Sequence, residues 1–399
     1  MGLTHTQEAF WDLLRCGLWG TPLNPSIFGE ADNTGDSSGS ANLGKASLLS
    51  HQDWKDIVEL AAEQTVTGVM FDALLTLPKA LRPPKDIYFN WVMRVGEMEY
   101  GGRNMNRVIA FLFQHLTKAK VAAYLMKGQA VARFYPQPLH REHGDIDLLV
   151  PDERDFEKVL QMMQTLTGDE GYVEEEERDH VAFMLNEVCV EVQGLNIYGI
   201  GRKCFQHYLD WAKESLKGEA QVLPPLQTEK QPELEPKTAM NVVAPPMRFD
   251  LMFVFVHLMN HFFDGGVGLR QVCDWMRYLH EKRSEIDLSQ LEKDLNTLGL
   301  MPHWQTMASM AVCQLGAPKE SIPFYSTSFD RKGRRALDHI LRSGNFGMLR
   351  TNVFEGKIDS RFLRRFGTLL SLFPTYGRVA RLFPADACFS FYRYAKRRL

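Results

Sequence analysis

The segment HGDIDLLV, His143–Val150, decides the fold because it places Asp145 and Asp147 in an otherwise apolar run. A short apolar run bounded by turn residues is typical of a buried β-strand. Side chains alternate across a strand, so both carboxylates point to one face while Ile146 and Leu148 point to the other. Buried carboxylates are expensive and two of them repel each other. A divalent cation between the aspartates is the compensation that we expect.

The neighbouring segments bear on this interpretation. An alternative is that the aspartates cap or end the strand beside Arg141 and His143, since HGD also has turn chemistry. However, the apolar run VAAYLMKG, residues 121–128, stops at a glycine, and the run VCVEVQG, residues 188–194, places Glu191 among apolar residues. Three carboxylates on neighbouring strands, with a glycine turn at a helix N-terminus that can receive a phosphate, are what two-metal phosphoryl or nucleotidyl transfer requires.

The order of patterns along the chain predicts the fold class. Helical spacing of apolar residues is found at 5–19, 54–77 and 87–118, and again beyond residue 246. Between these regions the order is strand, helix, strand, helix and then three short strands, GYVEEE, HVAFML and VCVEVQG. We therefore predict an α+β fold, in which a small mixed β-sheet core carries helical N-terminal and C-terminal parts.

Changes in composition indicate four regions. We expect a helical N-terminal region at 1–114 with a mobile Gly/Ser/Asn-rich loop at 29–45, an α/β core at 115–215, a proline-rich linker or loop at 216–246, with an edge hairpin as an option, and a helical C-terminal domain with a basic tail at 247–399.

Composition and charge limit the function classes. The chain has 399 residues and is 45% hydrophobic, which is enough material for more than one core. A net charge of −3 gives no general attraction for nucleic acid, so nucleic acid is not the expected partner. The N-terminus lacks a signal-peptide pattern, and the most apolar stretch, Leu251–Phe263, is too short to span a bilayer. We therefore expect a cytoplasmic protein without a transmembrane segment.

Two blocks of sequence carry a family resemblance. The block KGQAVARFYPQPLHREHGDIDLLV, residues 127–150, and the block HLMNHFFDGGVGLRQVCDW, residues 257–275, resemble a largely uncharacterised family of bacterial nucleotidyltransferase-like proteins, related to the polymerase-beta-type nucleotidyltransferase fold. The resemblance extends from about Trp54 to Phe366. It implies an enzyme that uses Mg²⁺ or Mn²⁺ and binds an NTP, with ATP among the candidates.

The resemblance also implies roles for the acids. Asp145 and Asp147 match the two acids of the D-x-D strand that ligate the metals. Glu191 is the candidate for the third acid, which is either a metal ligand or the general base that activates the acceptor hydroxyl.

The turn that holds the triphosphate in the superfamily corresponds to Lys127, Gly128 and Gln129. The superfamily usually has Gly-Ser or Gly-Gly there, so the serine is missing from this chain. Lys127 either pairs with the phosphates as a point charge or is a surface residue at a strand end.

The second block contains His257 and His261, which are four residues apart on one helix face, and then Arg270 and Asp274. In the functional interpretation, the glycines before Arg270 deliver its guanidinium to a cleft, where it binds a phosphate or the acceptor. In the structural alternative, the histidines are buried in a helix and Arg270 pairs with Asp274 at i, i+4.

We therefore predict a Mg-dependent nucleotidyltransferase that moves an NMP group from an NTP to an unidentified hydroxyl acceptor, which is a small molecule, a sugar or a protein. The alternative is a catalytically silent nucleotide-binding or partner-binding module of the same fold. The altered glycine turn favours the silent module, whereas the retention of three carboxylates favours the enzyme.

Overall fold

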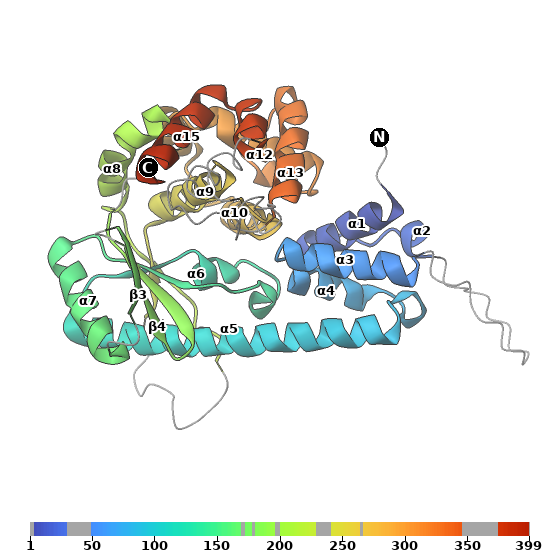
Figure 1. Ribbon diagram of the computed structural model, residues 1–399, viewed down its shortest axis with the longest axis horizontal. Coiled ribbons are helices and arrows are strands. Elements are labelled where there is room, and N and C mark those ends of the chain that lie inside the picture. Colours follow the sequence, from blue (N-terminus) through green and yellow to red (C-terminus); the bar gives the residue numbers. More distant parts are fainter. Residues whose placement is uncertain are drawn as a thin grey trace, which may run out of the picture.

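The computed structural model describes residues 4–29, 49–168, 172–177, 180–195, 200–228, 241–263, 266–344 and 374–398. Residues 30–45 of the predicted mobile loop lie outside these ranges. Most of the described chain is helical, and the helices surround one small sheet (Figure 1).

The N-terminal helices are α1 (His5–Trp19), α2 (Pro25–Phe28), α3 (His51–Glu63), α4 (Thr67–Thr76) and α5 (Lys85–Ala119), with the 3-10 helix η1 (Lys79–Leu81) before α5. The helical pattern expected at 54–77 is interrupted between α3 and α4, where Thr65 has a φ of 54°. A positive φ cannot continue an α-helix, so the chain turns there. Helix α5 crosses position 114, where we expected the N-terminal region to end.

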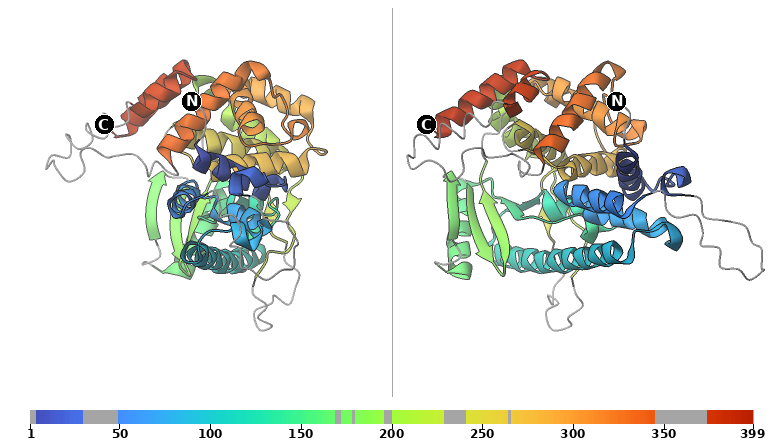
Figure 2. Two further views of the ribbon diagram at one scale, coloured as in Figure 1. Left: turned by 90° about the vertical axis from the view of Figure 1, so that its right-hand side faces the viewer. Right: turned by 45° about the vertical axis from the view of Figure 1, so that its right-hand side comes forward.

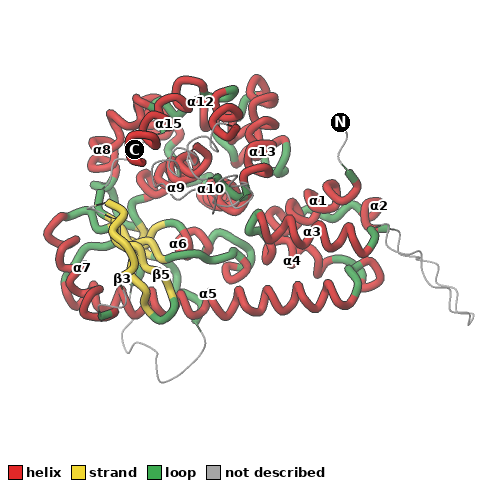
Figure 3. Tube along the Cα trace, in the orientation of Figure 1, coloured by secondary structure: helices red, strands yellow, loops and turns green. Residues whose placement is uncertain are grey.

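The sheet is mixed, as predicted. Figure 3 shows its strands in yellow among the red helices. Its strands are β1 (Tyr124–Met126), β2 (Ile146–Leu149), β3 (Tyr172–Glu177), β4 (His180–Leu185) and β5 (Val188–Gln193), in the spatial order β1-β2-β5-β4-β3. Strands β2 and β5 are parallel, and the other neighbours are antiparallel. Between the strands lie α6 (Gly128–Ala132), the 3-10 helix η2 (Pro138–His140) and α7 (Glu153–Thr167).

One face of the sheet forms its own apolar core. Leu148 of β2 and Val190 of β5 are fully buried in a cluster with Leu112 of α5 and Phe156 of α7. The alternation of side chains therefore leaves the opposite face to the polar residues of these strands.

The C-terminal helices are α8 (Arg202–Ser215), α9 (Met247–Phe263), α10 (Leu269–Lys282), α11 (Leu288–Leu298), α12 (Met301–Cys313), α13 (Asp330–Ser343) and α15 (Pro384–Arg398), with the 3-10 helices η4 (Lys319–Ser321) and η5 (Thr327–Phe329). The expected linker contains a short antiparallel pair, β6 (Gln221–Val222) with β7 (Val243–Ala244). Helices α9 to α15 gather on one side of the molecule, and α5 runs along the opposite side (Figures 1 and 2).

A larger apolar core joins the two ends of the chain. Phe10 of α1, Trp54 of α3, Phe255 of α9 and Trp275 of α10 are all buried in one cluster. The N-terminal and C-terminal helices therefore support each other. In the part of the chain that the structure describes, no helix is both long enough and apolar enough to cross a membrane.

Candidate active site

Three carboxylates meet at the polar face of the sheet. Asp145 immediately precedes β2, Asp147 lies within it, and the parallel pairing sets Asp147 opposite Glu191 of β5. One oxygen from each of the three side chains lies within 4.8 Å of the other two. Carboxylate oxygens are the ligands that Mg²⁺ and Mn²⁺ prefer, so this donor set fits a hard divalent cation.

Asp147 is the most buried of the three acids, with 2% of its surface exposed. Burial raises the pKa of Asp147, and the nearby carboxylates of Asp145 and Glu191 add to this, although Lys127 acts against it. The side-chain amide of Gln193 donates a hydrogen bond to Asp147 Oδ1 at 3.1 Å. The ionised form of Asp147 is therefore disfavoured until more positive charge arrives.

Glu191 has the opposite tendency. His180 Nε2 lies 3.0 Å from Glu191 Oε2 across the β4–β5 pair. Burial works to raise the pKa of Glu191, but the hydrogen bond from His180 and the positive charge of Lys127 outweigh it and lower that pKa. Glu191 is therefore an anion at neutral pH.

Lys127 lies at the turn between β1 and α6 and contacts Asp147 directly. Its Nζ is 2.7 Å from Asp147 Oδ1, in an ion pair that is almost completely buried. Its backbone has φ 48° and ψ −143°, a combination that costs a non-glycine residue on the order of 1–3 kcal/mol. The next residue, Gly128, has φ +32°, and a Cβ there would lie 3.3 Å from the carbonyl oxygen of Asp145. The backbone of the turn is therefore packed closely against the residue before β2.

Gln129 follows the turn, but its side chain is directed into the protein. Its amide nitrogen donates to Asn106 Oδ1 of α5 at 2.7 Å, and only 6% of the residue is exposed. From this position, the backbone N–H is the group that Gln129 can offer to a ligand at the turn.

Helix α9 brings the two predicted histidines to the same place. Both ring nitrogens of His257 lie 3.5 Å from Lys127 Nζ, and His257 Nε2 is 3.0 Å from His261 Nε2. Burial and the charge of Lys127 lower the pKa of His257 well below its usual range and that of His261 to about 4. Both imidazoles are therefore neutral neighbours of the lysine, on the side of the C-terminal helices.

Arg270 of α10 holds the loop that leads to Asp145. Its Nη1 donates to the carbonyl oxygens of Glu142 at 2.8 Å and of His143 at 3.2 Å. Of the glycines expected to deliver Arg270, Gly265 lies outside the described residues.

Asp274 has a different partner from the one that the i, i+4 alternative named. Its two carboxylate oxygens accept hydrogen bonds from Arg141 Nε at 3.1 Å and Nη2 at 2.7 Å, and Oδ1 also accepts from the hydroxyl of Tyr135 at 2.8 Å. Arg141 therefore binds Asp274 and does not form the strand-end pair with the aspartates that we considered.

Three neighbours of the site were not predicted from the sequence. They are His180 beside Glu191, Gln193 beside Asp147, and Asn106 beside Gln129. A signal existed only for Gln193, which stands two residues after Glu191 in one strand and therefore shares its face.

The small mixed sheet, with three clustered acids from two neighbouring strands on one face, is compatible with a nucleotidyltransferase-type fold. The model of a family described as "Uncharacterised nucleotidyltransferase" matches residues 50–316, which is more than half of the chain, and the chain belongs to this family. This confirms the resemblance to an uncharacterised nucleotidyltransferase family for residues 50–316, and the bacterial origin stays a prediction.

Among solved structures, the chain is similar to an antigenic nucleotidyltransferase-like protein from Paracoccidioides brasiliensis, with 14% sequence identity and a TM-score of 0.30. The match covers 49% of this chain and 92% of that one. No curated protein matches the sequence.

Proposed function

We propose that the chain is a metal-dependent nucleotidyltransferase that moves an NMP group from an NTP to a hydroxyl acceptor. The observation that carries the proposal is the cluster of Asp145, Asp147 and Glu191, whose ligand atoms lie within 4.8 Å of one another. Membership of a nucleotidyltransferase family supports it.

The three acids would hold Mg²⁺ or Mn²⁺. When bound, such an ion neutralises charge on the phosphate oxygens and on the departing pyrophosphate. Of the two roles considered for Glu191, ligand and general base, its lowered pKa favours the ligand, because a weakly basic carboxylate is a poor proton acceptor.

The turn that begins at Lys127 is proposed to bind the triphosphate. Lys127 Nζ is a cation on a flexible stem, so it can exchange Asp147 for a phosphate oxygen when a nucleotide arrives. Gly128 has no side chain to obstruct the approach, and Gln129 would contribute its backbone N–H. For Arg270 we propose support of the loop before Asp145, while direct contact of Arg270 with a phosphate or the acceptor remains a prediction.

The reaction forms one bond and breaks one. The acceptor oxygen bonds to the α-phosphorus, and the bond from that phosphorus to the bridging oxygen breaks, so pyrophosphate leaves and the acceptor proton passes to water. The protein's share is to position the nucleotide and acceptor in line and to hold the charges that stabilise the transition state.

A second candidate function is a catalytically silent module of the same fold. The Lys127–Asp147 ion pair favours it, because this pair already supplies a cation inside the acid cluster. The side chain of Gln129, which is bonded to Asn106 and directed away from a ligand, is consistent with it as well.

The two candidates differ in turnover. Purified protein is incubated with each α-labelled NTP, with Mg²⁺ or Mn²⁺ and with a panel of hydroxyl acceptors, beside the double variant Asp145→Asn/Asp147→Asn. The enzyme hypothesis predicts metal-dependent pyrophosphate release and a labelled product that the double variant does not form. Nucleotide binding without turnover across the panel would favour the silent module.

A further inference from the structure

A cavity lies between the N-terminal helices and the loop that carries Asp145. It has a volume of about 410 Å³ and opens to the surface. We call it the α3–α5 pocket, and it is lined by Ala62 of α3, Thr67 of α4, Arg94, Glu97 and Met98 of α5, and Glu142 and His143 of the loop. It is separate from the acid cluster but shares the loop with it.

Three side chains of the α3–α5 pocket carry buried polar atoms without a hydrogen-bond partner among the described residues. These atoms are Thr67 Oγ1, Glu142 Oε2 and His143 Nδ1. Thr67 is only 1% exposed, so bulk solvent does not reach its hydroxyl. Each buried polar group left without a partner costs about 1–3 kcal/mol. These three groups are the donors and acceptors that a ligand in the cavity, or water in its absence, would pair with.

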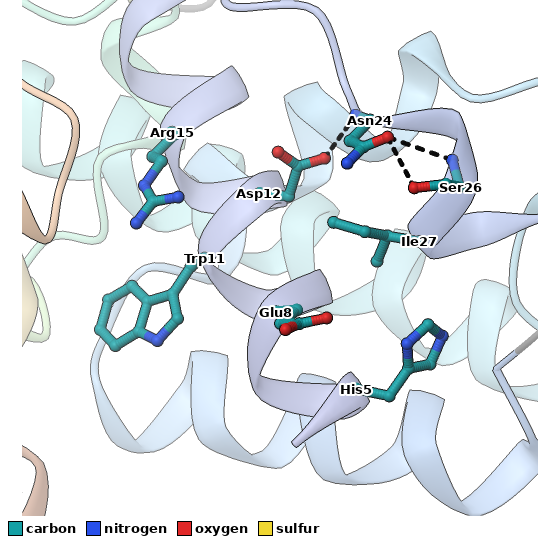
Figure 4. A pocket seen from close by; sticks show the side chains of 8 residues that line it. All are labelled: His5, Glu8, Trp11, Asp12, Arg15, Asn24, Ser26 and Ile27. Carbon is teal, nitrogen blue, oxygen red and sulfur yellow. Dashed lines mark hydrogen bonds between the residues drawn. The ribbon is translucent and has the colours of Figure 1, made fainter. Parts of the chain in front are cut away.

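A second cavity, between α1 and α2, serves as a comparison (Figure 4). It has a similar volume of about 380 Å³, but several of its polar groups are hydrogen bonded within the protein. Asp12 accepts from the backbone N–H of Asn24 at 2.7 Å, and Asn24 accepts from the Ser26 hydroxyl at 2.9 Å. Arg15 donates to a backbone carbonyl of the C-terminal part. Among the described residues, none that lines this cavity has a buried side-chain N or O atom without a hydrogen-bond partner.

The α3–α5 pocket is close to the acids along the loop. Glu142 and Asp145 are three residues apart, so their Cα atoms are separated by no more than roughly 11 Å. Between them, Gly144 is exposed, and the Arg270 guanidinium lies 3.8 Å from where a Cβ of Gly144 would stand. Arg270 binds the carbonyls of Glu142 and His143 and fixes this stretch. A molecule that extends out of the pocket along this loop would approach Asp145.

The chemistry of the lining residues indicates what kind of molecule fits. Burial raises the pKa of the Glu142 carboxyl group. Thr67 both donates and accepts, and a neutral imidazole does so as well. Hydroxyl groups match this set because each one also donates and accepts. Arg94 and Glu97 have opposite charges, so the pocket favours neither anions nor cations.

We propose that the α3–α5 pocket binds the acceptor, and that this acceptor is an uncharged sugar-like molecule with several hydroxyl groups. The assignment as acceptor rests on the proposed function, but the binding itself does not. In this scheme Thr67, Glu142 and His143 determine specificity, since a site built to pair with hydroxyl groups rejects molecules that lack them.

The binding test uses glucose, galactose and myo-inositol as probes, with saturation-transfer NMR on the full chain in the absence of NTP and metal. We expect a signal from at least one probe with the unaltered protein and with Met93→Trp, a control on α5 whose side chain is exposed outside the pocket. Ala62→Trp fills the pocket and should abolish the signal. Thr67→Val, which removes one hydroxyl and keeps the shape, should weaken binding by about tenfold.

Two results would overturn the pocket proposal. One is the absence of a signal from all three probes with the unaltered protein, and the other is an unchanged signal in both Ala62→Trp and Thr67→Val. Asp147→Asn separates this proposal from the proposed function, because this variant should still bind the sugar. Sugar binding without any NMP transfer would contradict the proposed function alone, whereas NMP transfer that Ala62→Trp leaves intact would contradict the pocket alone.

Discussion

The molecule buries two aspartates to nearly the same extent and treats them in opposite ways. Asp274 is 5% exposed and Asp147 is 2% exposed, so access to water does not distinguish them. Asp274 meets the guanidinium of Arg141 through two hydrogen bonds and the hydroxyl of Tyr135 through a third. Asp147 forms an ion pair with Lys127, whose positive charge also acts on Glu191 in the same cluster.

The comparison shows that burial of a charge does not by itself indicate function. The Arg141–Asp274 pair is balanced, and it joins the loop before β2 to helix α10. The cluster around Asp147 has three carboxylates and one lysine, with a histidine beside Glu191. This excess of negative charge is what we expect of a site that receives a cation from outside. Substitutions at Asp147 and at Asp274 should therefore have different effects.

The largest expected effect is on activity, in Asp147→Asn. Removing one metal-ligating carboxylate should lower kcat/KM by about a thousandfold, which corresponds to about 4 kcal/mol. Without metal, the Asp147→Asn variant should unfold at a higher temperature than the unaltered chain, because a disfavoured buried charge is removed while Lys127 keeps the charge of Glu191 nearby. The pyrophosphate-release assay measures kcat/KM, and calorimetry measures the unfolding temperature. A large fall in the unfolding temperature of Asp147→Asn would mean that Asp147, like Asp274, stabilises the fold.

Asp274→Ala should have the opposite result. We expect the free energy of unfolding to fall by about 3–5 kcal/mol, because Arg141 would remain buried without its partner. Urea denaturation measures this value. The double variant Arg141→Met/Asp274→Leu is the control, and it should recover much of the loss, since both charges are gone. A loss below about 1 kcal/mol in the single variant would show that the pair behaves like an exposed one.

Lys127→Met tests whether the lysine takes the place of a cation. Without its ammonium group, Mn²⁺ should bind the acids about tenfold more tightly in the absence of nucleotide, a change of about 1.4 kcal/mol. NTP binding should become weaker, because the proposed phosphate contact is lost. Titrations with Mn²⁺ alone and then with NTP separate the two effects. Equal Mn²⁺ affinity in both proteins would argue against competition between the lysine and the metal.

The smallest expected effect is a change in how stability depends on pH. It concerns His140, which is paired with carboxylates within the protein. His140 lies 2.7 Å from Asp72 and 3.0 Å from Glu99. Burial works to lower the pKa of His140, but the two carboxylates outweigh it and raise that pKa. Its contribution to stability is therefore complete below the unfolded pKa of about 6.5 and is lost as the pH rises through the folded pKa.

The measurement is the midpoint of urea unfolding across this pH range, compared with that of His140→Gln. The variant should show a flatter pH profile, since the titrating group has been removed. Identical profiles would mean that other groups determine this dependence.

Structural features that depend on a local sequence pattern could be predicted from the sequence. Helix α5 was expected at 87–118 and spans Lys85–Ala119, because its amphipathic spacing is long and regular. The mixed sheet was predicted from the order of its elements. The proximity of Asp145 and Asp147 follows from the alternation of side chains in one strand.

Long-range partners could not be predicted in this way. The ion pair of Arg141 with Asp274 joins residues 133 positions apart, and the contact of Gln129 with Asn106 depends on how α6 packs against α5. The i, i+4 rule suggested Arg270 as the partner of Asp274, but tertiary packing brought Arg141 to it instead. The register that sets Glu191 opposite Asp147 is likewise a property of the folded sheet.

The most direct test of the central claim is calorimetric titration of NTPs into the protein, with and without Mg²⁺ or Mn²⁺. If the three acids hold the metal that binds the nucleotide, at least one NTP should bind the unaltered protein only when the metal is present. Asp145→Asn/Asp147→Asn should also abolish this binding while the protein stays folded. The absence of metal-dependent binding for every NTP, or equal binding in the double variant, would contradict the account.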